Sequence, residues 1–420
     1  MGILDPATAV IVSFCFLGIL LYKRVNLGIT LNATALLLAL LSVPWQEIPR
    51  IIYATVDYTT SDGLLTISVV LATFGIMLLS QLYKETGEIT RLSESLSSIV
   101  KNPKIVLSVL PAIIGFLPVA GGALMSAPLV DSEAEKLKLK PEKKAYVNLW
   151  FRHTIFPVYP LSQVLIITAA LTATTVPLII LRQIPVVIGM IIVGYGIGFW
   201  KVSNPKNEEK TAKEKNNLSS NFKNFLTSFS PIIATIIVAV FMESISPSLA
   251  KQGFDVLIAT IVGIIVLITI TKPSLHVLKI PLKSTGIYGV TLAAYGAFFL
   301  KGTVSAAGIS QILKTFLTNG SVDIFLFLTI IPAFLGFLTG SASGGVAIGA
   351  SILAGVFSFS PKTAALLYMS AYLGYIIAPT HLCFTFTANY FKCPLGKVYK
   401  YVIPSFLATF VTALLIYFLF

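Results

Sequence analysis

Two clusters of small residues lie inside apolar segments, at residues 118–126 and 339–351. Small residues let a backbone approach a ligand closely, and a helix that begins there presents N–H groups with partial positive charge. A helix that ends there offers carbonyl oxygens that suit Na⁺. The clusters therefore indicate binding of an anion, and Na⁺ is the candidate metal ion. Their candidate binding residues are Gly121, Gly122, Ser126, Ser341, Ser343, Gly344 and Gly345.

Two other apolar segments, 145–171 and 363–391, are interrupted by proline and carry polar side chains beside the interruption. An ionisable residue at membrane depth is costly and is by default a functional candidate. Arg152 could balance the charge of an anionic substrate, and His153 or His381 could carry a coupling proton. The candidates here are Asn148, Arg152, His153, Pro157, Pro379, Thr380 and His381.

Structural explanations for the same residues stay open. Small residues also allow close helix packing, Arg152 and His153 could form an interfacial pair at the end of a span, and His381 could be a hydrogen-bonded structural histidine. The three cysteines, Cys15, Cys383 and Cys393, lack paired metal spacing and are expected to be packing residues.

Composition places the chain in a membrane. Of its 420 residues, 56% are hydrophobic and only 11% are charged, whereas soluble domains carry about 25% charged residues. The net charge of +13 comes from Lys and Arg between apolar runs, which is typical of topology determinants and not of nucleic-acid binding. The expected partners are therefore a lipid bilayer and a small anionic substrate.

The first cluster belongs to a stretch that the chain repeats. Residues 111–127 read PAIIGFLPVAGGALMSA and residues 332–348 read PAFLGFLTGSASGGVAI, with matching positions 221 apart. Pro157 and Pro379 match at an offset of 222. We therefore predict a duplication, with a first repeat at 1–200, a cytoplasmic linker at 201–225 and a second repeat at 226–420.

Hydrophobic runs predict five spans in each half and one re-entrant hairpin in each, at 104–130 and 322–355. The charged segment 131–144 is predicted to be a loop, and 84–103 and 302–318 to be amphipathic helices. The expected spans cover 7–23, 28–43, 64–83, 145–171, 180–200, 227–245, 253–271, 284–300, 363–391 and 400–420.

An odd number of crossings in the first half inverts the second half relative to it. With hairpins that enter and leave on one side, 23 of the 30 Lys and Arg residues fall on one face, 6 on the other, and Arg152 within a span. This positive-inside bias predicts a cell-membrane protein with both termini outside and the loops 131–144 and 201–223 in the cytoplasm. The predicted fold class is an all-α polytopic membrane protein with two inverted repeats, each with a re-entrant hairpin and a discontinuous helix.

Two stretches carry a resemblance to a known family. GGALMSAPLVDSE at 121–133 and NLWFRHTIFPVYP at 148–160 are similar to the prokaryotic membrane family called domain-of-unknown-function family 401, which is grouped with the ion transporter superfamily. The resemblance implies opposed hairpins, a homodimer and an elevator-type movement. It also implies substrate and cation sites at the hairpin tips and span breaks.

The predicted function is secondary active transport of a small carboxylate-type anion, coupled to H⁺ or Na⁺ and without another cofactor. The chain has no GxxxxGK[ST] phosphate-binding loop, so direct ATP drive is not expected. A cation/proton antiporter is the main alternative, although such proteins usually place Asp or Glu in the membrane core. A channel, and a hydrolase that pairs Ser343 with His381, are weaker alternatives; we expect no catalytic residues. We expect the second tip, with two hydroxyls, to make more polar contacts than the first.

Overall fold

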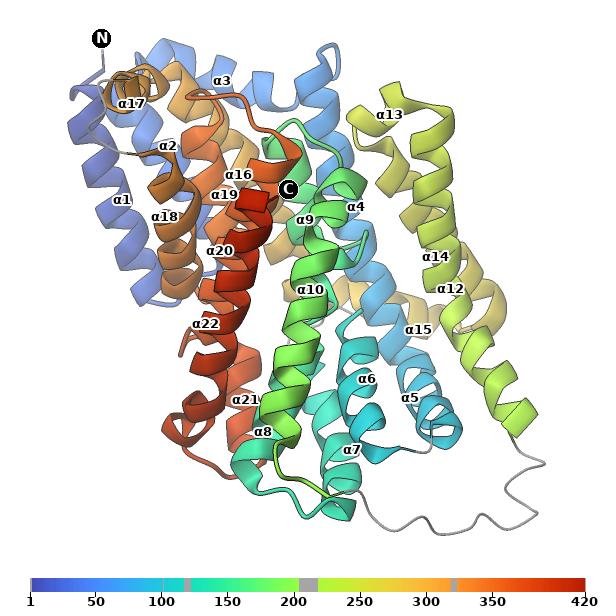
Figure 1. The fold of residues 1–420 in the computed structure, drawn as a ribbon. Helices are drawn as coiled ribbons and strands as arrows, with labels where there is room; N and C mark the ends of the chain where they lie inside the picture. Colours follow the sequence, from blue (N-terminus) through green and yellow to red (C-terminus); the bar gives the residue numbers. More distant parts are fainter. Residues whose placement is uncertain (1, 101, 117–121, 204–217, 319–322, 420) are drawn as a thin grey trace.

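The computed structural model describes residues 2–100, 102–116, 122–203, 218–318 and 323–419, and every regular element among them is a helix. Figure 1 shows the arrangement. Up to residue 203 the elements are α1 (Pro6–Tyr22), α2 (Leu27–Ser42), η1 (Trp45–Glu47), α3 (Ile48–Thr55), α4 (Ser61–Glu85), α5 (Glu88–Ile99), α6 (Pro103–Gly115), α7 (Gly122–Lys136), α8 (Pro141–Arg152), η2 (Phe156–Val158), α9 (Gln163–Leu171) and α10 (Val176–Phe199).

The elements from residue 218 onward follow a similar order. They are α12 (Leu218–Ile245), α13 (Pro247–Lys251), α14 (Phe254–Thr271), α15 (Leu275–Lys279), η3 (Pro281–Lys283), α16 (Thr285–Ala306), α17 (Ile309–Thr318), α18 (Ile324–Thr339), α19 (Ala342–Leu353), α20 (Pro361–Ile377), α21 (Leu382–Tyr390) and α22 (Leu395–Leu419).

Eight helical segments among the described residues are long and apolar enough to cross a membrane, counting α8–α9 and α20–α21 as one each. The chain is therefore an all-helical, multi-pass membrane protein, as predicted. The remaining two predicted spans correspond to α1 and α2, which have 17 and 16 residues. At 1.5 Å per residue each is about 25 Å long, slightly less than the ~30 Å hydrocarbon core.

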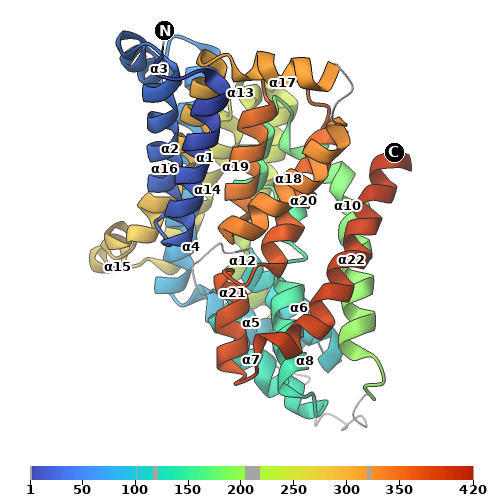
Figure 2. The same ribbon diagram turned by 90° about the vertical axis from the view of Figure 1, so that its left-hand side faces the viewer.

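The two helix pairs that contain the repeated stretch lie at opposite ends of the molecule. Figures 1 and 2 both place α6 and α7 in the lower half and α18 and α19 in the upper half. Each pair carries a proline inside its first helix, Pro111 in α6 and Pro332 in α18. The amphipathic helices follow the same division, with α5 below and α17 above.

The two proline-containing spans are broken, as predicted. In the first, α8 ends at Arg152 and α9 begins at Gln163, with Pro157 in the short η2 between them. In the second, α20 ends at Ile377 and α21 begins at Leu382, with Pro379 in the turn. Proline cannot donate the N–H that an uninterrupted helix needs at these positions.

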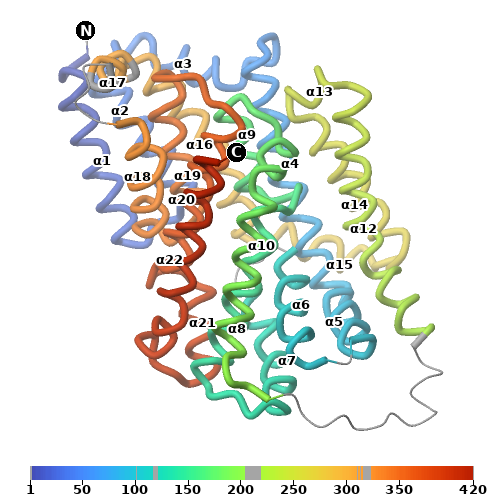
Figure 3. Tube along the Cα trace, viewed as in Figure 1, coloured from blue at the N-terminus to red at the C-terminus, as the bar shows by residue number. Residues whose placement is uncertain are grey.

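The hairpin and broken helices of the two halves pack crosswise. Helix α7 contacts α21, and α19 contacts α9. Helices α10 and α22 also pack together, and Figure 3 shows them descending side by side from the upper part of the molecule, where both termini lie. The cross-packing brings the two breaks together.

Glycines permit close approach at equivalent places in both halves. A Cβ at Gly115 of α6 would meet the Arg152 carbonyl oxygen at the end of α8, and a Cβ at Gly336 of α18 would meet the Ala371 carbonyl oxygen in α20. A side chain at either position would force the helices apart. These contacts set each hairpin against the broken helix of its own half.

Two predicted loop boundaries are wrong. The segment 131–144 is largely helical, because α7 continues to Lys136 and α8 begins at Pro141. Glu and Lys, which are frequent in this segment, are good helix formers, and Lys144 pairs with Asp131 and Glu135 across the short connection. Similarly, α12 begins at Leu218, inside the predicted loop 201–223, because polar residues can extend a membrane helix into water.

Candidate functional site

The two broken spans meet at a pair of histidines. His153 caps the end of α8, and His381 is the N-cap residue of α21. Their rings lie 4.8 Å apart, nearly perpendicular, and both side chains are buried. One residue from each half therefore contributes to a single polar centre.

His153 is held by contacts to both halves. Its Nδ1 lies 2.6 Å from the Leu149 carbonyl oxygen, so Nδ1 carries the proton, and its Nε2 lies 3.3 Å from the Tyr375 hydroxyl. Tyr372 donates a hydrogen bond of 2.6 Å to the His153 carbonyl oxygen. Two tyrosines of α20 thus fix the first break against the second half.

Arg152 directly precedes His153 and is 1% exposed. Its guanidinium lies against Gly122, since a Cβ placed there would collide with Nη2, Cζ and Nη1. Gly122 is the first residue of α7, where helix N–H groups lack intrahelical partners. A buried cation therefore stands at the positive end of a helix dipole, which makes the place suitable for an anion.

Asn148 links the first hairpin to the second half. Its amide nitrogen donates to the Ala123 carbonyl oxygen in α7 at 3.0 Å and to Thr387 Oγ1 in α21 at 3.2 Å. Its side chain is fully buried, and among the described residues its Oδ1 has no hydrogen-bond partner. A buried amide oxygen without a partner is costly, so the position is suited to a further donor.

The second tip is a helix start with two hydroxyls. Gly340 has a φ of 60° and lies against Thr380, and Ser341 is the N-cap of α19. Ser341 Oγ accepts from the Gly344 N–H at 3.3 Å and lies 2.9 Å from Ser343 Oγ. Both serines are half-buried. The hydroxyls are thus used in part to cap the helix.

Other predicted site residues contribute to packing. A Cβ at Gly345 would meet Gly336 and Ala371, and a Cβ at Gly344 would meet Thr339. Ser126 is buried and donates to the Ala123 carbonyl oxygen of its own helix. These contacts are the close helix packing that small residues allow.

The prolines and Thr380 occupy the breaks themselves. Pro157 is buried in the first break, whereas Pro379 and Thr380 are exposed at the second. Gly121 lies outside the described residues. Asn148, Arg152, His153 and His381 are thus brought together around the breaks, while Ser341 and Ser343 lie at the opposite hairpin tip beside Thr380.

Comparison with known proteins identifies the family. The model of the family described as "Protein of unknown function (DUF401)" matches residues 7–420. The chain belongs to this family. The search of curated proteins gave no match. Among solved structures, that of the YdaH transporter of Alcanivorax borkumensis, reported to have an unusual topology, is similar at 14% identity over 88% of each chain with a TM-score of 0.48.

Several residues of the centre in this DUF401 chain were not predicted from the sequence. Tyr372, Tyr375 and Thr387 supply hydrogen bonds to it. Cys383, expected to be a packing residue, lies with both histidines in a group whose ligand atoms are all within 4.8 Å of one another. The spacing of His381 and Cys383 was a usable signal, but the third member is 228 positions away.

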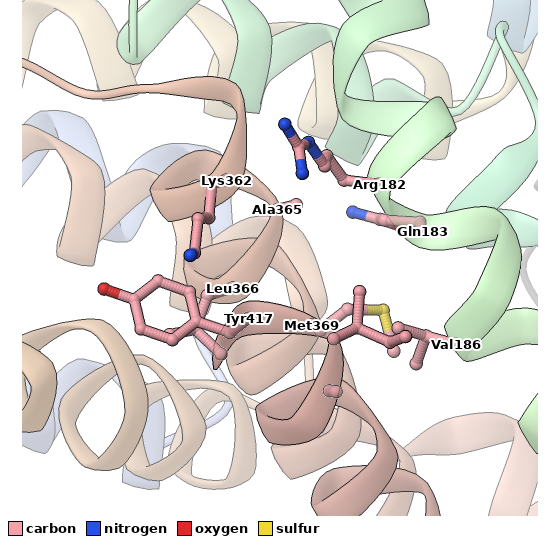
Figure 4. Close-up of a pocket in the computed structure, with 10 residues that line it drawn as sticks. Arg182, Gln183, Val186, Lys362, Ala365, Leu366, Met369 and Tyr417 are labelled. Atoms are coloured by element: carbon pink, nitrogen blue, oxygen red, sulfur yellow. The ribbon is translucent and has the colours of Figure 1, made fainter. Parts of the chain in front are cut away.

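A surface recess lies elsewhere, between α10, α20 and α22. It has a volume of about 340 Å³, and Leu178, Leu181, Arg182, Pro185, Pro361 and Ile416 line it. Figure 4 shows the adjoining pocket, with Arg182 and Gln183 on one side and Lys362 and Tyr417 on the other. The recess contains none of the residues at the breaks or at the second tip.

Proposed function

We propose that this DUF401 protein is a secondary active transporter for a small carboxylate-type anion, coupled to H⁺ or Na⁺. The observation that carries the proposal is Arg152, a fully buried guanidinium set against the first turn of α7. A guanidinium offers planar N–H donors that match the two oxygens of a carboxylate, and the N-terminal turn of α7 adds partial positive charge beside it, so together they are suited to bind a carboxylate.

The position of this charge favours transport over a static role. Arg152 is the last residue of α8, directly before the break. Broken helices inside a membrane are tolerated where they line a cavity or are covered by protein. Two breaks at repeat-related positions, in contact through His153 and His381, are typical of substrate sites in transporters with inverted repeats.

In the proposed mechanism, Arg152 and the N-terminus of α7 bind the carboxylate, and Ser341 and Ser343 at the second tip supply hydroxyl contacts. Na⁺ would be bound by backbone carbonyls at the tips, or one of the two histidines would carry a coupling proton. The hairpin and broken helices would move together as an elevator between the two membrane faces, within a homodimer.

The proposed topology has two inverted repeats, at 1–200 and 226–420, with opposed re-entrant hairpins and both termini outside. Supporting it are the placement of α6–α7 and α18–α19 at opposite ends and the concentration of Lys and Arg on one predicted face. Single cysteines at Lys138 and Lys301, introduced in a background of Cys→Ser variants, test it with a membrane-impermeant thiol reagent. In intact cells we expect labelling at residue 301 and none at 138; the reverse pattern would overturn the topology.

Uptake into proteoliposomes tests the function. A panel of radiolabelled mono-, di- and tricarboxylates is offered under an inward H⁺ gradient and, separately, an inward Na⁺ gradient. We expect one carboxylate class to accumulate under one gradient and not when that gradient is collapsed. Flat uptake of the whole panel under both gradients would refute the proposal. Cation/proton exchange without any anion would support the antiporter instead, although neither break, 153–162 or 378–381, contains Asp or Glu.

A further inference from the structure

We propose that His153, His381 and Cys383 form a binding site for a soft d¹⁰ metal ion, Cu(I), at the junction of the two breaks. The three side chains come from the two breaks: His153 follows α8, whereas His381 caps α21 and Cys383 lies in its first turn. Their ligand atoms are all within 4.8 Å of one another.

The hydrogen bonds at the two rings direct the correct nitrogen atoms toward a metal. Nδ1 of His153 faces the Leu149 carbonyl oxygen at 2.6 Å, and Nδ1 of His381 faces the Ile376 carbonyl oxygen at 3.5 Å. Carbonyl oxygens only accept hydrogen bonds, so both Nδ1 atoms carry protons and both Nε2 atoms keep their lone pairs. Backbone carbonyls fix the tautomer of metal-binding histidines in the same way.

One of these lone pairs lacks a partner among the described residues. His381 is 1% exposed, and its Nε2 is buried with no hydrogen bond. The other, His153 Nε2, accepts only the 3.3 Å contact from the Tyr375 hydroxyl, which can rotate away. A buried acceptor without a partner costs free energy that a bound metal would recover.

Ligand type and charge select the metal. A thiolate with two imidazoles is a soft donor set, which favours Cu(I) and Zn²⁺ over Mg²⁺ or Ca²⁺. Binding releases the Cys383 thiol proton to solvent, so a Cu(I) complex with two neutral imidazoles and one thiolate has no net charge. The Zn²⁺ complex would carry one positive charge beside Arg152 in a buried site, where like charges repel strongly. Charge therefore favours Cu(I).

The distances require only a small adjustment. Metal–nitrogen and metal–sulfur bonds of roughly 2.0 and 2.3 Å place ligand atoms roughly 3.5–4 Å apart. The farthest pair must therefore approach by about 1 Å, which side-chain rotation can supply. The site joins the two halves of the chain, and it goes beyond the proposed transport, because metal binding can be measured without any transported anion.

Anaerobic Cu(I) competition with the chromophoric chelator bathocuproine disulfonate tests the site on the purified full chain. We expect one Cu(I) per chain, with copper-edge X-ray absorption showing both nitrogen and sulfur ligands. His381→Gln and Cys383→Ser should each weaken Cu(I) binding at least tenfold. Tyr375→Phe, which removes the competing hydroxyl, should retain or tighten it, and Zn²⁺ should bind more weakly than Cu(I).

Two matched controls make the result specific. Cys393→Ser removes another half-buried cysteine, and His276→Gln removes the third histidine, which is exposed in α15; both should bind Cu(I) as the wild type does. Thermal unfolding of each variant reports whether it is folded. The proposal is overturned if folded His381→Gln and Cys383→Ser bind Cu(I) like the wild type, if Cys393→Ser loses it equally, or if X-ray absorption shows no sulfur ligand. If the wild type binds no Cu(I), the metal site is overturned, whereas carboxylate uptake by the wild type still tests transport on its own.

Discussion

The two breaks are related in sequence but differ in their surroundings. At the first, Arg152, His153 and Pro157 are all buried, and Gly122 lies directly against the guanidinium. At the second, Pro379 and Thr380 are exposed, and the adjacent tip serines are half-buried. The same hairpin-and-break arrangement thus forms a closed, charged side and an open, hydroxyl-bearing side.

This difference separates two roles that small residues play in the repeat. On the first side a glycine makes room for a charged group, because the guanidinium occupies the space of the missing Cβ at Gly122. On the second side Gly336, Gly345 and Gly374 make room for neighbouring backbone or a small side chain. We therefore expect substitution of Gly122 to impair function and substitution of Gly336 to impair stability.

The largest effect is expected from Arg152→Gln. Loss of one hydrogen bond to a charged group, worth about 1.5–3 kcal/mol, should lower kcat/KM for anion uptake roughly 10- to 150-fold. Arg182→Gln, which changes an arginine in the recess between α10 and α22, is the control and should retain uptake. Equal uptake by wild type and a folded Arg152→Gln variant would remove Arg152 from the site.

Two glycine substitutions test the division of roles next. A Cβ at Gly336 would meet the Ala371 carbonyl oxygen, which cannot move without shifting α20, whereas a Cβ at Gly122 would meet the end of a flexible arginine. Gly336→Ala should cost about 1–3 kcal/mol through overpacking and lower the unfolding temperature by several degrees. Gly122→Ala should unfold close to the wild-type temperature but bind the anion more weakly. Thermal unfolding and anion uptake are measured for both variants. A destabilised Gly122→Ala variant together with a Gly336→Ala variant of wild-type stability would contradict the difference between the two sides.

Removing both tip hydroxyls should have a smaller effect. The double variant Ser341→Ala/Ser343→Ala loses a helix cap and two neutral hydrogen-bonding groups. We expect roughly two- to tenfold weaker substrate affinity, in line with about 0.5–1.5 kcal/mol for a neutral hydrogen bond. The KM for uptake measures this. An unchanged KM would mean that the second tip contacts the substrate only through its backbone. The prediction that this tip makes more polar contacts than the first would then be wrong.

The smallest effects concern the charged connection between α7 and α8, which the second half lacks. Lys144 is 13% exposed and pairs with Asp131 and Glu135, while Lys136 is 55% exposed and pairs with Glu133. Lys136→Ala should change the free energy of unfolding by less than about 0.5 kcal/mol, because exposed ion pairs contribute little. Lys144→Ala should destabilise more. A larger loss for Lys136→Ala in thermal unfolding would show that exposure does not rank these pairs.

Much of this fold could be predicted because its signals are local. Apolar runs of about 20 residues locate the spans, and Pro157 and Pro379 mark the breaks where a helix cannot continue. The helical ends of 131–144 and 201–223 could not be predicted, because polar residues in water can form either a loop or a helix. In 131–144 the helical form is accompanied by the ion pair Lys144–Asp131, which joins residues 13 positions apart.

The site was predictable in its parts but not in its assembly. Arg152 and the two histidines are conspicuous because charge is rare in apolar sequence. No local pattern indicates that Tyr375 reaches His153, or that Thr387 reaches Asn148 across 239 positions. Those contacts depend on how the halves cross, with α7 against α21 and α19 against α9. Likewise, Gly345 resembles a binding residue until its packing against Gly336 is seen.

The role of Arg152 is tested by a structure determined with bound carboxylate, chosen from the uptake panel. We expect the carboxylate to contact both the Arg152 guanidinium and the N-terminal turn of α7, on the closed side of the paired breaks. An anion bound instead in the recess near Arg182 and Lys362, with Arg152 unchanged and out of contact, would contradict it.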